Sequence, residues 1–340
     1  MAEPLPELLL GWFRENRREL PWRRDREPYH VWVSEIMLQQ TRVEAVKGYY
    51  LRFLEHLPTI GHLAEASENE LLKLWEGLGY YSRVRNLQKA ARKIMEEHGG
   101  VFPRQYDEVL ALPGIGPYTA GAICSICFEQ PTPAVDGNVL RVLSRYLASE
   151  EPVTDAATRR RMEQLLGKIY PAGHCGEFTQ ALMELGATVC LPNGRPKCQN
   201  CPLEGQCRAR KMGKQEAFPL RAKKKEKRTE KRTVFILRCG ERLAVCKRPE
   251  KGLLAGLWQL PDVPGELTDR QALAQAESWG LHPTGIEKMT HREHIFTHVK
   301  WELIGCYLTC ARGERFLWVT PEQLRQEIGL PTAYRQFLEE

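Results

Sequence analysis

The chain has 340 residues, of which 42% are hydrophobic and 27% are charged, and its formal net charge is +6. This is the composition of an ordinary globular protein, and the length exceeds what one hydrophobic core usually supports, so we expect two domains. No run of 18 apolar residues occurs and the amino terminus lacks the features of a signal peptide, which excludes a membrane-spanning helix and predicts a soluble, cytoplasmic protein.

The apolar pattern changes once along the chain. From Pro6 to about Gly186 apolar residues recur at helical spacing, and frequent glycine and proline breaks predict many short helices. After Arg232 the pattern favours strands, with two helical stretches between them. The expected strands cover 233–238, 242–246, 299–308 and 316–319, and the expected helices lie near 269–279 and 321–327. We place the boundary within residues 215–230.

Positive charge is concentrated at this boundary. Residues 208–232 contain twelve Lys or Arg and three Asp or Glu, a local charge of +9 that leaves −3 for the rest of the chain. Such a segment suits contacts with phosphates. A solvated linker between domains is an equally good interpretation.

Four of the eleven cysteines are close together in the sequence: Cys190, Cys198, Cys201 and Cys207. Thiolates within such a short segment can converge on one metal centre, and both zinc and a [4Fe-4S] cluster are chemically allowed. One close pair with two wider flanking intervals resembles the cluster loop of the endonuclease III superfamily more than a structural zinc site. In that superfamily the first interval is one residue shorter. We expect the remaining seven cysteines to be packing residues.

The segment Leu112-Pro-Gly-Ile-Gly-Pro-Tyr118 lies between two helical stretches. It matches the hairpin of helix-hairpin-helix DNA-binding proteins, in which Gly114 and Gly116 permit a close approach of backbone amides to a phosphate. An ordinary tight turn is the alternative. The cysteine loop downstream favours the DNA-binding interpretation.

Asp136 stands just before an apolar helical run, where an acidic residue can serve as a helix cap. In helix-hairpin-helix glycosylases an aspartate at this point faces the sugar of a flipped nucleotide. Cleavage of an N-glycosidic bond develops positive charge on the deoxyribose, which a fixed carboxylate stabilises. Bifunctional members carry at position 118 a lysine that forms a Schiff base. Because this chain has Tyr118, we predict a glycosylase that uses water and lacks strong lyase activity.

Two longer stretches make the resemblance specific. Leu20-Pro-Trp-Arg-Arg-Asp with Tyr29-His-Val-Trp-Val-Ser-Glu-Ile-Met-Leu-Gln-Gln-Thr, and Trp75-Glu-Gly-Leu-Gly-Tyr-Tyr-Ser-Arg-Val-Arg-Asn-Leu, closely resemble the adenine DNA glycosylases of the MutY family. With the hairpin, the aspartate and the cysteines, the similarity covers residues 7 to 210.

The resemblance implies a role for individual residues. Glu35 would be the general acid that protonates adenine, which requires a carboxylic acid that stays protonated near neutral pH; a surface helix residue is the alternative. Tyr118 and Asn138 would organise the sugar, Asp136 and the attacking water. The adenine pocket would be lined by Trp22, Arg23 and Gln180. The wedge and the DNA contacts would come from Gln40, Thr41, Leu78 and Tyr80 together with Gly114 and Gly116. For Leu78 and Trp22 a plain core role is equally expected.

Residues 247–261 resemble the start of a Nudix-type fold. An active Nudix hydrolase needs a carboxylate-rich helix for magnesium, and the corresponding stretch has only Glu277. We therefore predict a domain that binds and does not hydrolyse. The resemblance implies that Phe296, Thr297 and His298 recognise the oxidised guanine; an ordinary strand with alternating faces is the alternative.

The expected fold is a mainly α helix-hairpin-helix glycosylase domain over 1–214, with one [4Fe-4S] cluster in a loop over 190–207, a basic linker over 215–230 and an α+β Nudix-like domain over 231–340. The expected activity is excision of adenine paired with 8-oxoguanine or guanine in double-stranded DNA, by a monomer that uses no membrane. Three alternatives are a thymine or oxidised-pyrimidine glycosylase, a non-catalytic damage sensor and a Nudix hydrolase. The C-terminal region argues against the first alternative, and the presence of both Glu35 and Asp136 argues against the second. The missing metal-binding carboxylates argue against the third.

Overall fold

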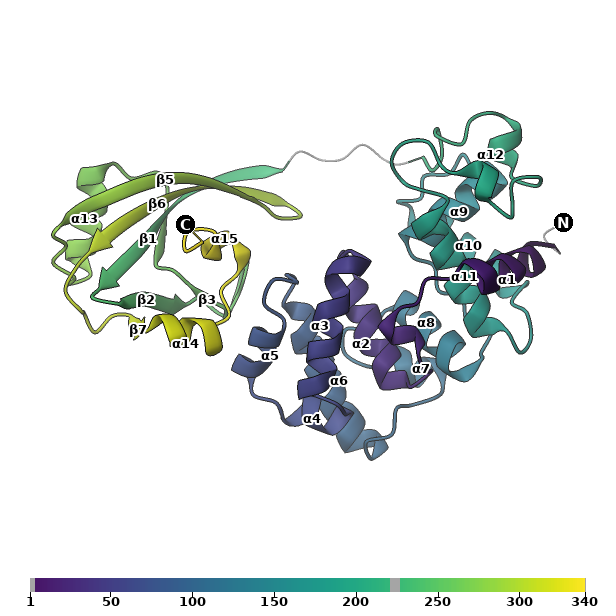
Figure 1. The fold of residues 1–340 in the computed structure, drawn as a ribbon, viewed down its shortest axis with the longest axis horizontal. Coiled ribbons are helices and arrows are strands. Elements are labelled where there is room, and N and C mark those ends of the chain that lie inside the picture. Colours follow the sequence, from purple (N-terminus) through teal and green to yellow (C-terminus); the bar gives the residue numbers. More distant parts are fainter. Residues whose placement is uncertain (1–3, 221–226, 340) are drawn as a thin grey trace. The chain divides into compact units, whose positions relative to one another are not determined.

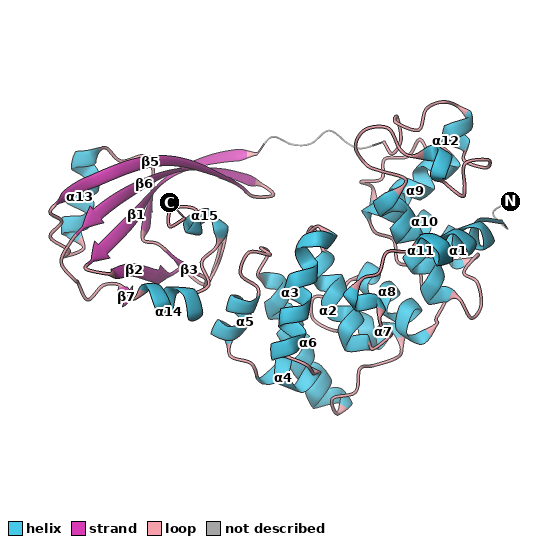
Figure 2. Ribbon diagram, in the orientation of Figure 1, coloured by secondary structure: helices cyan, strands magenta, loops and turns pink. Residues whose placement is uncertain are grey.

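The computed structural model describes residues 4–220 and 227–339 (Figure 1). Contacts between Cα atoms group the chain into two compact units. The first comprises Met1–Glu65 with Arg85–Lys223, and the second comprises Ala66–Val84 with Lys224–Glu340. The first unit is built from helices and the second around a β-sheet (Figure 2). Of the basic segment over 215–230, residues 221–226 lie outside the described residues.

The helical unit consists of many short helices, as the glycine and proline breaks predict. It contains α1 (Pro4–Asn16), η1 (Pro21–Arg23), α2 (Pro28–Leu38), α3 (Val43–His56), α4 (Ile60–Glu65), most of α6 (Ser82–His98), α7 (Tyr106–Leu110), α8 (Pro117–Phe128), α9 (Gly137–Leu147), α10 (Ala156–Gly167), α11 (Cys175–Thr188), η2 (Cys198–Asn200) and α12 (Arg208–Lys211). None of the described helices is long and apolar enough to cross a membrane.

Helix α11 lies at the centre of this unit and packs against α1, α8 and α9. Two of its glycines make the packing close. A Cβ atom at Gly176 would lie 2.8 Å from Ile126 Cα of α8, and one at Gly186 would lie 2.5 Å from Asn138 Cβ of α9. Side chains do not approach so closely, so both positions require glycine. The close contact at Gly186 brings α11 next to the start of α9.

The predicted hairpin joins α7 to α8. Gly114 has a φ of +78°, and a Cβ there would lie 2.6 Å from Asn86 Cβ. Glycine is therefore required at this turn on two independent grounds. Gly116 is the N-cap of α8 and has an extended backbone, with Pro117 in the first turn. No side chain caps the first amides of α8.

The second unit contains a seven-stranded sheet in the order β3-β2-β1-β6-β5, with β4 paired to β1 and β7 paired to β2. Strand β1 runs parallel to β6, and β5 and β6 form an antiparallel hairpin. The strands are β1 (Arg228–Cys239), β2 (Arg242–Lys247), β3 (Trp258–Gln259), β4 (Asp262–Pro264), β5 (Gly285–Ile295), β6 (Val299–Thr309) and β7 (Leu317–Val319). The helices are α5 (Glu68–Leu74), α13 (Asp269–Ser278), α14 (Pro321–Gln326) and α15 (Thr332–Arg335).

Strand β1 is buried on both faces because alternate side chains point to opposite sides of a strand. Val234 and Ile236 contribute to one core together with Tyr334 and residues near α15. Phe235 and Leu237 contribute to a second core with the alanines of α13. The sheet is therefore covered on both sides, which the continuous apolar run of this strand requires.

The strands expected over 233–238, 242–246, 299–308 and 316–319 are confirmed as β1, β2, β6 and β7, and the helices near 269–279 and 321–327 as α13 and α14. Strand β5 was not expected. It is half-exposed along its length and lacks a run of apolar residues, so its pairing with β6 is what makes it a strand. The inclusion of Ala66–Val84 in the sheet unit was also not expected.

Candidate active site

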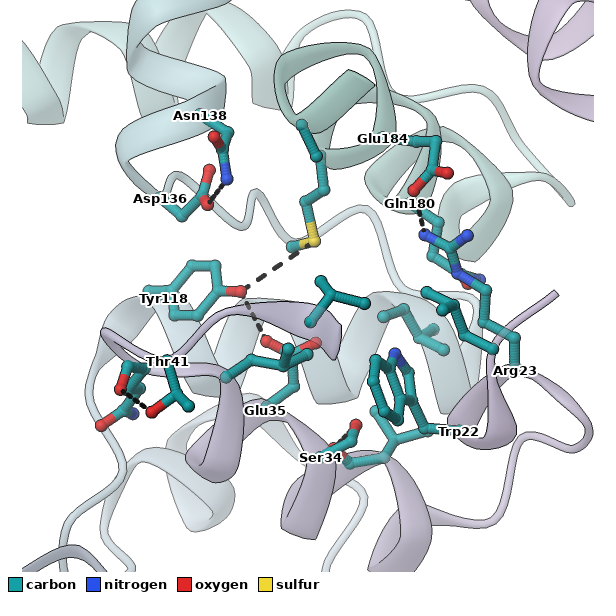
Figure 3. Close-up of a pocket in the computed structure, with 18 of the residues that line it drawn as sticks. Trp22, Arg23, Ser34, Glu35, Thr41, Tyr118, Asp136, Asn138, Gln180 and Glu184 are labelled. Atoms are coloured by element: carbon teal, nitrogen blue, oxygen red, sulfur yellow. Dashed lines mark hydrogen bonds and ion pairs between the residues drawn. The ribbon is translucent and has the colours of Figure 1, made fainter. Parts of the chain in front are cut away.

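A cavity of about 500 Å³ opens in the helical unit (Figure 3). Its walls come from η1, α2, the first turns of α8 and α9, and α11. The predicted residues at its wall are Trp22, Arg23, Glu35, Gln40, Thr41, Tyr118, Asp136, Asn138 and Gln180. The volume is in the range of small-ligand sites. Residues from three separate motifs of the sequence, together with Gln180, thus line one cavity.

Glu35 is buried on α2 and is 5% exposed. Its Oε2 atom accepts a hydrogen bond of 2.5 Å from the hydroxyl of Tyr118, which stands in the first turn of α8. Burial raises the pKa of Glu35 to about 7, opposed by the Tyr118 hydrogen bond and assisted by the charge of Asp136. The surface alternative for Glu35 is therefore wrong, and its carboxyl group can hold a proton near neutral pH.

Asp136 is the N-cap of α9, so the helix-cap interpretation is correct as far as it goes. Its Oδ1 accepts from the Val139 amide at 2.7 Å, and its Oδ2 accepts from Asn138 Nδ2 at 2.8 Å. Burial raises the pKa of Asp136, while these hydrogen bonds and the charge of Arg141 oppose the rise. Both oxygens are thus held in place at the cavity wall (Figure 3).

Arg141 supports this arrangement from within the core. It is 4% exposed, and its Nη2 donates to Asn138 Oδ1 at 2.8 Å and to the Gly186 carbonyl at 2.8 Å. Its Nε donates to the Cys190 carbonyl at 2.7 Å. One buried guanidinium therefore connects the asparagine beside Asp136 with the beginning of the cysteine loop. Sequence reasoning did not single out this residue.

Glu184 on α11 was also missed. Its side chain is fully buried and accepts from Arg18 Nε at 2.7 Å and from Arg23 Nη2 at 2.8 Å. Burial alone would raise the pKa of Glu184, but the two arginines outweigh burial and bring that pKa down to about 2. An acidic residue between the apolar Met183 and Leu185 was the available signal, because a buried carboxylate needs partners.

The remaining wall residues differ in exposure. Trp22 is buried and packs edge-on against Tyr50 at a centroid distance of 5.5 Å. Gln180 donates to the Gly176 carbonyl within α11 at 3.3 Å. Gln40 is exposed and has a φ of +59°, which is uncommon for a residue other than glycine. It directs the chain out of α2 at the cavity rim.

The four clustered cysteines line a second cavity in the helical unit, between α9, α11 and the loop that follows. Cys198, Cys201 and Cys207 each lie within electrostatic range of Cys190. Arg145 Nη1 donates to Cys190 Sγ at 3.2 Å. Among the described residues no three Cys, His, Asp or Glu side chains have the arrangement of a metal-ion site. The four cysteines thus share one cavity.

In the sheet unit, two residues predicted from separate motifs lie together. The hydroxyl of Tyr80 and Oγ1 of Thr297 are 2.7 Å apart. Tyr80 is 46% exposed with a φ of +48°, whereas Leu78 is buried, as its core alternative predicts. Thr297 stands at the exposed tip of the β5–β6 hairpin.

The neighbours of Thr297 differ in their surroundings. Phe296 is half-buried and packs against Trp301 at a centroid distance of 4.9 Å, and its amide donates to the Val299 carbonyl at 2.8 Å. His298 is exposed. The tip therefore combines one anchored aromatic ring with two exposed polar residues.

Comparison with known proteins agrees with this geometry. Residues 33–168 match the HhH-GPD superfamily base excision DNA repair protein family, and residues 233–340 match the NUDIX domain. A thermostable thymine-DNA glycosylase has a TM-score of 0.56 and 28% identity, covering 61% of this chain and 95% of its own. Endonuclease III in a non-covalent complex with DNA has a TM-score of 0.53 and 26% identity, covering 62% of this chain and 94% of its own.

The helical fold and its cavity define a base excision repair glycosylase of the helix-hairpin-helix superfamily, followed by a Nudix-like domain. Adenine DNA glycosylase of Homo sapiens is 38% identical over 93% of this chain and 70% of its own length. The enzyme of the same name from Buchnera aphidicola of Acyrthosiphon pisum is 33% identical over 98% of this chain and 96% of its own. The chain belongs to the adenine DNA glycosylase family, whose members are DNA repair enzymes.

Proposed function

We propose that this glycosylase removes adenine paired with 8-oxoguanine, and less well with guanine, from duplex DNA. The observation that carries the proposal is that buried Glu35, hydrogen-bonded to Tyr118, and Asp136 line one cavity. This hydrolysis needs two groups. One is an acid that keeps its proton near neutral pH, and the other is a carboxylate held in place by hydrogen bonds. The adenine enters the cavity after flipping out of the helix.

Glu35 acts as the general acid. Adenine is a poor leaving group as an anion, so departure requires a proton on a ring nitrogen such as N7. Because burial raises its pKa to about 7, the Glu35 carboxyl group can carry a proton near neutral pH. Trp22, Arg23 and Gln180 line the space around the base.

Asp136 acts on the sugar. Positive charge develops on the deoxyribose as the bond to adenine breaks, and a carboxylate held by the Val139 amide and Asn138 stabilises it without reorganising. Water then attacks the sugar. Tyr118 and Asn138 orient Asp136 and that water.

The reaction stops after base removal. Lyase chemistry needs an amine that forms a Schiff base with the sugar, and the described residues lining the cavity include no lysine. Borohydride should therefore trap no covalent complex between the protein and DNA. Efficient trapping would show that an amine reaches the sugar.

The residue opposite adenine is recognised by the sheet unit. Tyr80, Thr297 and His298 present polar atoms to the oxidised guanine, and Phe296 supports them from its place on Trp301. In the helical unit, Gln40 replaces lost stacking and Thr41 contacts the DNA. In the sheet unit, exposed Tyr80 has the same role as Gln40, while buried Leu78 is a core residue. Gly114 and Gly116 offer backbone amides to a phosphate.

The four cysteines are proposed to hold one [4Fe-4S] cluster. A cluster takes one thiolate at each of four irons, and the four cysteines line one cavity, which supports the proposal. When bound, the cluster supplies a rigid crosslink for the loop. Arg145 would donate its hydrogen bond to the bound sulfur of Cys190.

The Nudix-like part is proposed to bind without hydrolysing. Of the carboxylates on α13, Glu277 accepts a hydrogen bond from exposed His282, and no row of acids follows it. We propose that the glycosylase domain covers 1–214, the basic linker 215–230 and the Nudix-like domain 231–340. We also propose that the protein acts as a monomer.

A single-turnover assay tests the proposed function. Adenine release is measured from duplexes that differ only in the base opposite adenine, namely 8-oxoguanine, guanine or cytosine. The proposal requires the fastest release opposite 8-oxoguanine, slower release opposite guanine and an intact 8-oxoguanine strand. Equal rates on all three duplexes would refute the recognition, and no release from any would refute the activity.

A further inference from the structure

The turn that carries Leu78 and Tyr80 contacts the C-terminal part of the sheet unit through the residue that precedes the turn, Glu76. Both segments belong to one compact unit, since Ala66–Val84 is grouped with Lys224–Glu340. We define the wedge turn as residues 77–80. It follows α5 directly and contains three left-handed backbone conformations, with φ of +98° at Gly77, +69° at Gly79 and +48° at Tyr80. Such a turn needs outside contacts to hold one conformation.

Glu76, the residue before the wedge turn, makes the first of these contacts. Its side chain is 14% exposed. One carboxylate oxygen accepts a hydrogen bond of 2.9 Å from the backbone amide of Leu330, and the other accepts from Lys73 Nζ at 2.7 Å. Lys73 also donates to the Ile328 carbonyl at 3.3 Å. A carboxylate with a neighbouring lysine thus joins the end of α5 to the segment between α14 and α15.

The backbones at this point are also close. A Cβ atom at Gly329 would lie 3.2 Å from the Leu72 carbonyl oxygen of α5. A larger residue at this position would require the two segments to shift by a few tenths of an ångström, so glycine suits the close approach beside the Leu330 amide. The attachment therefore depends on backbone proximity as well as charge.

The tip of the wedge turn makes the second contact. Tyr80 meets Thr297 at 2.7 Å, and Arg83 Nη2 donates to the carbonyls of Leu78 and Gly79 at 3.0 and 3.1 Å. The Arg83 guanidinium also lies 5.6 Å from the Tyr80 ring centroid. The turn is thus held at Glu76 on one side and at the hairpin tip on the other.

We propose that Glu76 is a positioning residue for selection of the base opposite adenine. Through its hydrogen bond with the Leu330 amide it fixes where the wedge turn begins, and therefore where the Tyr80 hydroxyl meets Thr297. Glu76 is not among the residues that line the cavity of the helical unit. Its removal should weaken the preference for 8-oxoguanine over guanine while the chemistry in the helical unit continues. This inference rests on the proposed function, because it presumes that Tyr80 and Thr297 read that base.

The experiment compares three full-length variants in single-turnover adenine release from duplexes with 8-oxoguanine or guanine opposite adenine. Glu76→Ala removes the carboxylate, and Glu76→Gln keeps an oxygen that can accept from the Leu330 amide. Glu70→Ala is the matched control, because Glu70 is exposed on α5, the helix that ends just before Glu76. We expect Glu76→Ala to lower the ratio of the two rates by about tenfold, as loss of one charge-assisted hydrogen bond would. Glu76→Gln should retain more of the ratio than Glu76→Ala, and Glu70→Ala should leave it unchanged.

A combined variant tests whether Glu76 acts through the hairpin tip. If it does, Glu76→Ala added to Thr297→Val should lower the rate ratio no further than Thr297→Val alone. The inference is overturned if Glu76→Ala leaves the ratio at the wild-type value or slows release from both duplexes equally. It is also overturned if the effects of the two substitutions on the rate ratio multiply in the combined variant. If the wild-type protein itself shows no preference for 8-oxoguanine, the proposed function fails before the inference is reached.

Discussion

The hydroxyl of Tyr118 donates a hydrogen bond of 2.5 Å to Glu35 Oε2. This bond joins the first turn of α8, which follows the hairpin, to the buried acid of α2, so the element proposed to meet a phosphate and the proposed general acid are directly connected. It also favours the ionised form of Glu35, because a donor stabilises a carboxylate. Burial raises the pKa of Glu35, and the Tyr118 hydrogen bond limits that rise.

Tyr118→Phe should therefore shift the pH dependence of adenine release. In the wild-type protein the single-turnover rate should fall as pH rises through about 7, where Glu35 loses its proton. Without the phenol donor the pKa of Glu35 rises further, and the alkaline decline should move to higher pH. The measurement is the rate as a function of pH for both proteins. A decline that stays in place, or moves to lower pH, would show that Glu35 does not govern it.

Glu35→Gln should abolish adenine release and yet stabilise the fold at alkaline pH. Because the pKa of Glu35 is raised from 4.5 to about 7, its contribution to stability is complete below 4.5 and is lost as pH rises through about 7. A neutral glutamine avoids this loss and can still accept from Tyr118. At about pH 8 the free energy of unfolding should rise by up to ~3 kcal/mol, with little change in acid. Denaturant unfolding measures it, and Glu70→Gln is the exposed control; lower stability of Glu35→Gln at alkaline pH would contradict the account.

The two hairpin glycines should respond differently to alanine. Gly114→Ala places a Cβ at a φ of +78° and 2.6 Å from Asn86 Cβ, so it should lower the free energy of unfolding by about 2 kcal/mol or more. A Cβ at Gly116 meets no other atom within 4 Å, so Gly116→Ala should change it by less than ~0.5 kcal/mol. Thermal and denaturant unfolding of both variants compare the two sites. Equal effects would mean that the hairpin has another conformation.

Glu184→Gln should destabilise the protein at neutral pH, because it leaves Arg18 and Arg23 without a counter-charge in a buried site. The pKa of Glu184 is held at about 2, so its stabilising contribution is present above the ordinary value of 4.5 and is lost as pH falls through about 2. The expected loss at neutral pH is about 2 kcal/mol or more, and it should shrink in strong acid. Glu177→Gln on the same helix, whose partner Arg14 is half-exposed, should cost less than ~1 kcal/mol. Equal losses for the two variants would argue against the buried pair.

Much of the helical unit could be predicted from the sequence because its signals are local. Short helices follow from apolar spacing and from glycine and proline, and the hairpin follows from Gly114 and Gly116. The residues at the cavity wall could be named because the motifs that contain Glu35, Tyr118 and Asp136 resemble those of a known family. Their meeting in one cavity is a property of the fold, and the structure shows it.

The features that escaped prediction depend on contacts between distant parts of the chain. Glu184 and Arg141 are ordinary charged residues within their helices, and their partners lie tens of residues away or more. Strand β5 has no apolar run and exists through its register with β6. The attachment of Glu76 to the Leu330 amide joins residues 254 positions apart, a relationship that no local pattern contains.

We expect Glu35 and Asp136 together to carry out the removal of adenine. Asp136→Asn keeps a side-chain oxygen for the Val139 amide, so the cap of α9 should survive. The most direct measurement is single-turnover adenine release opposite 8-oxoguanine by the wild-type protein, Glu35→Gln and Asp136→Asn, with unfolding and duplex binding measured on the same samples. Each variant should bind the duplex and fold normally while losing about 10³-fold or more in rate. Release at the wild-type rate by either folded variant would contradict the account.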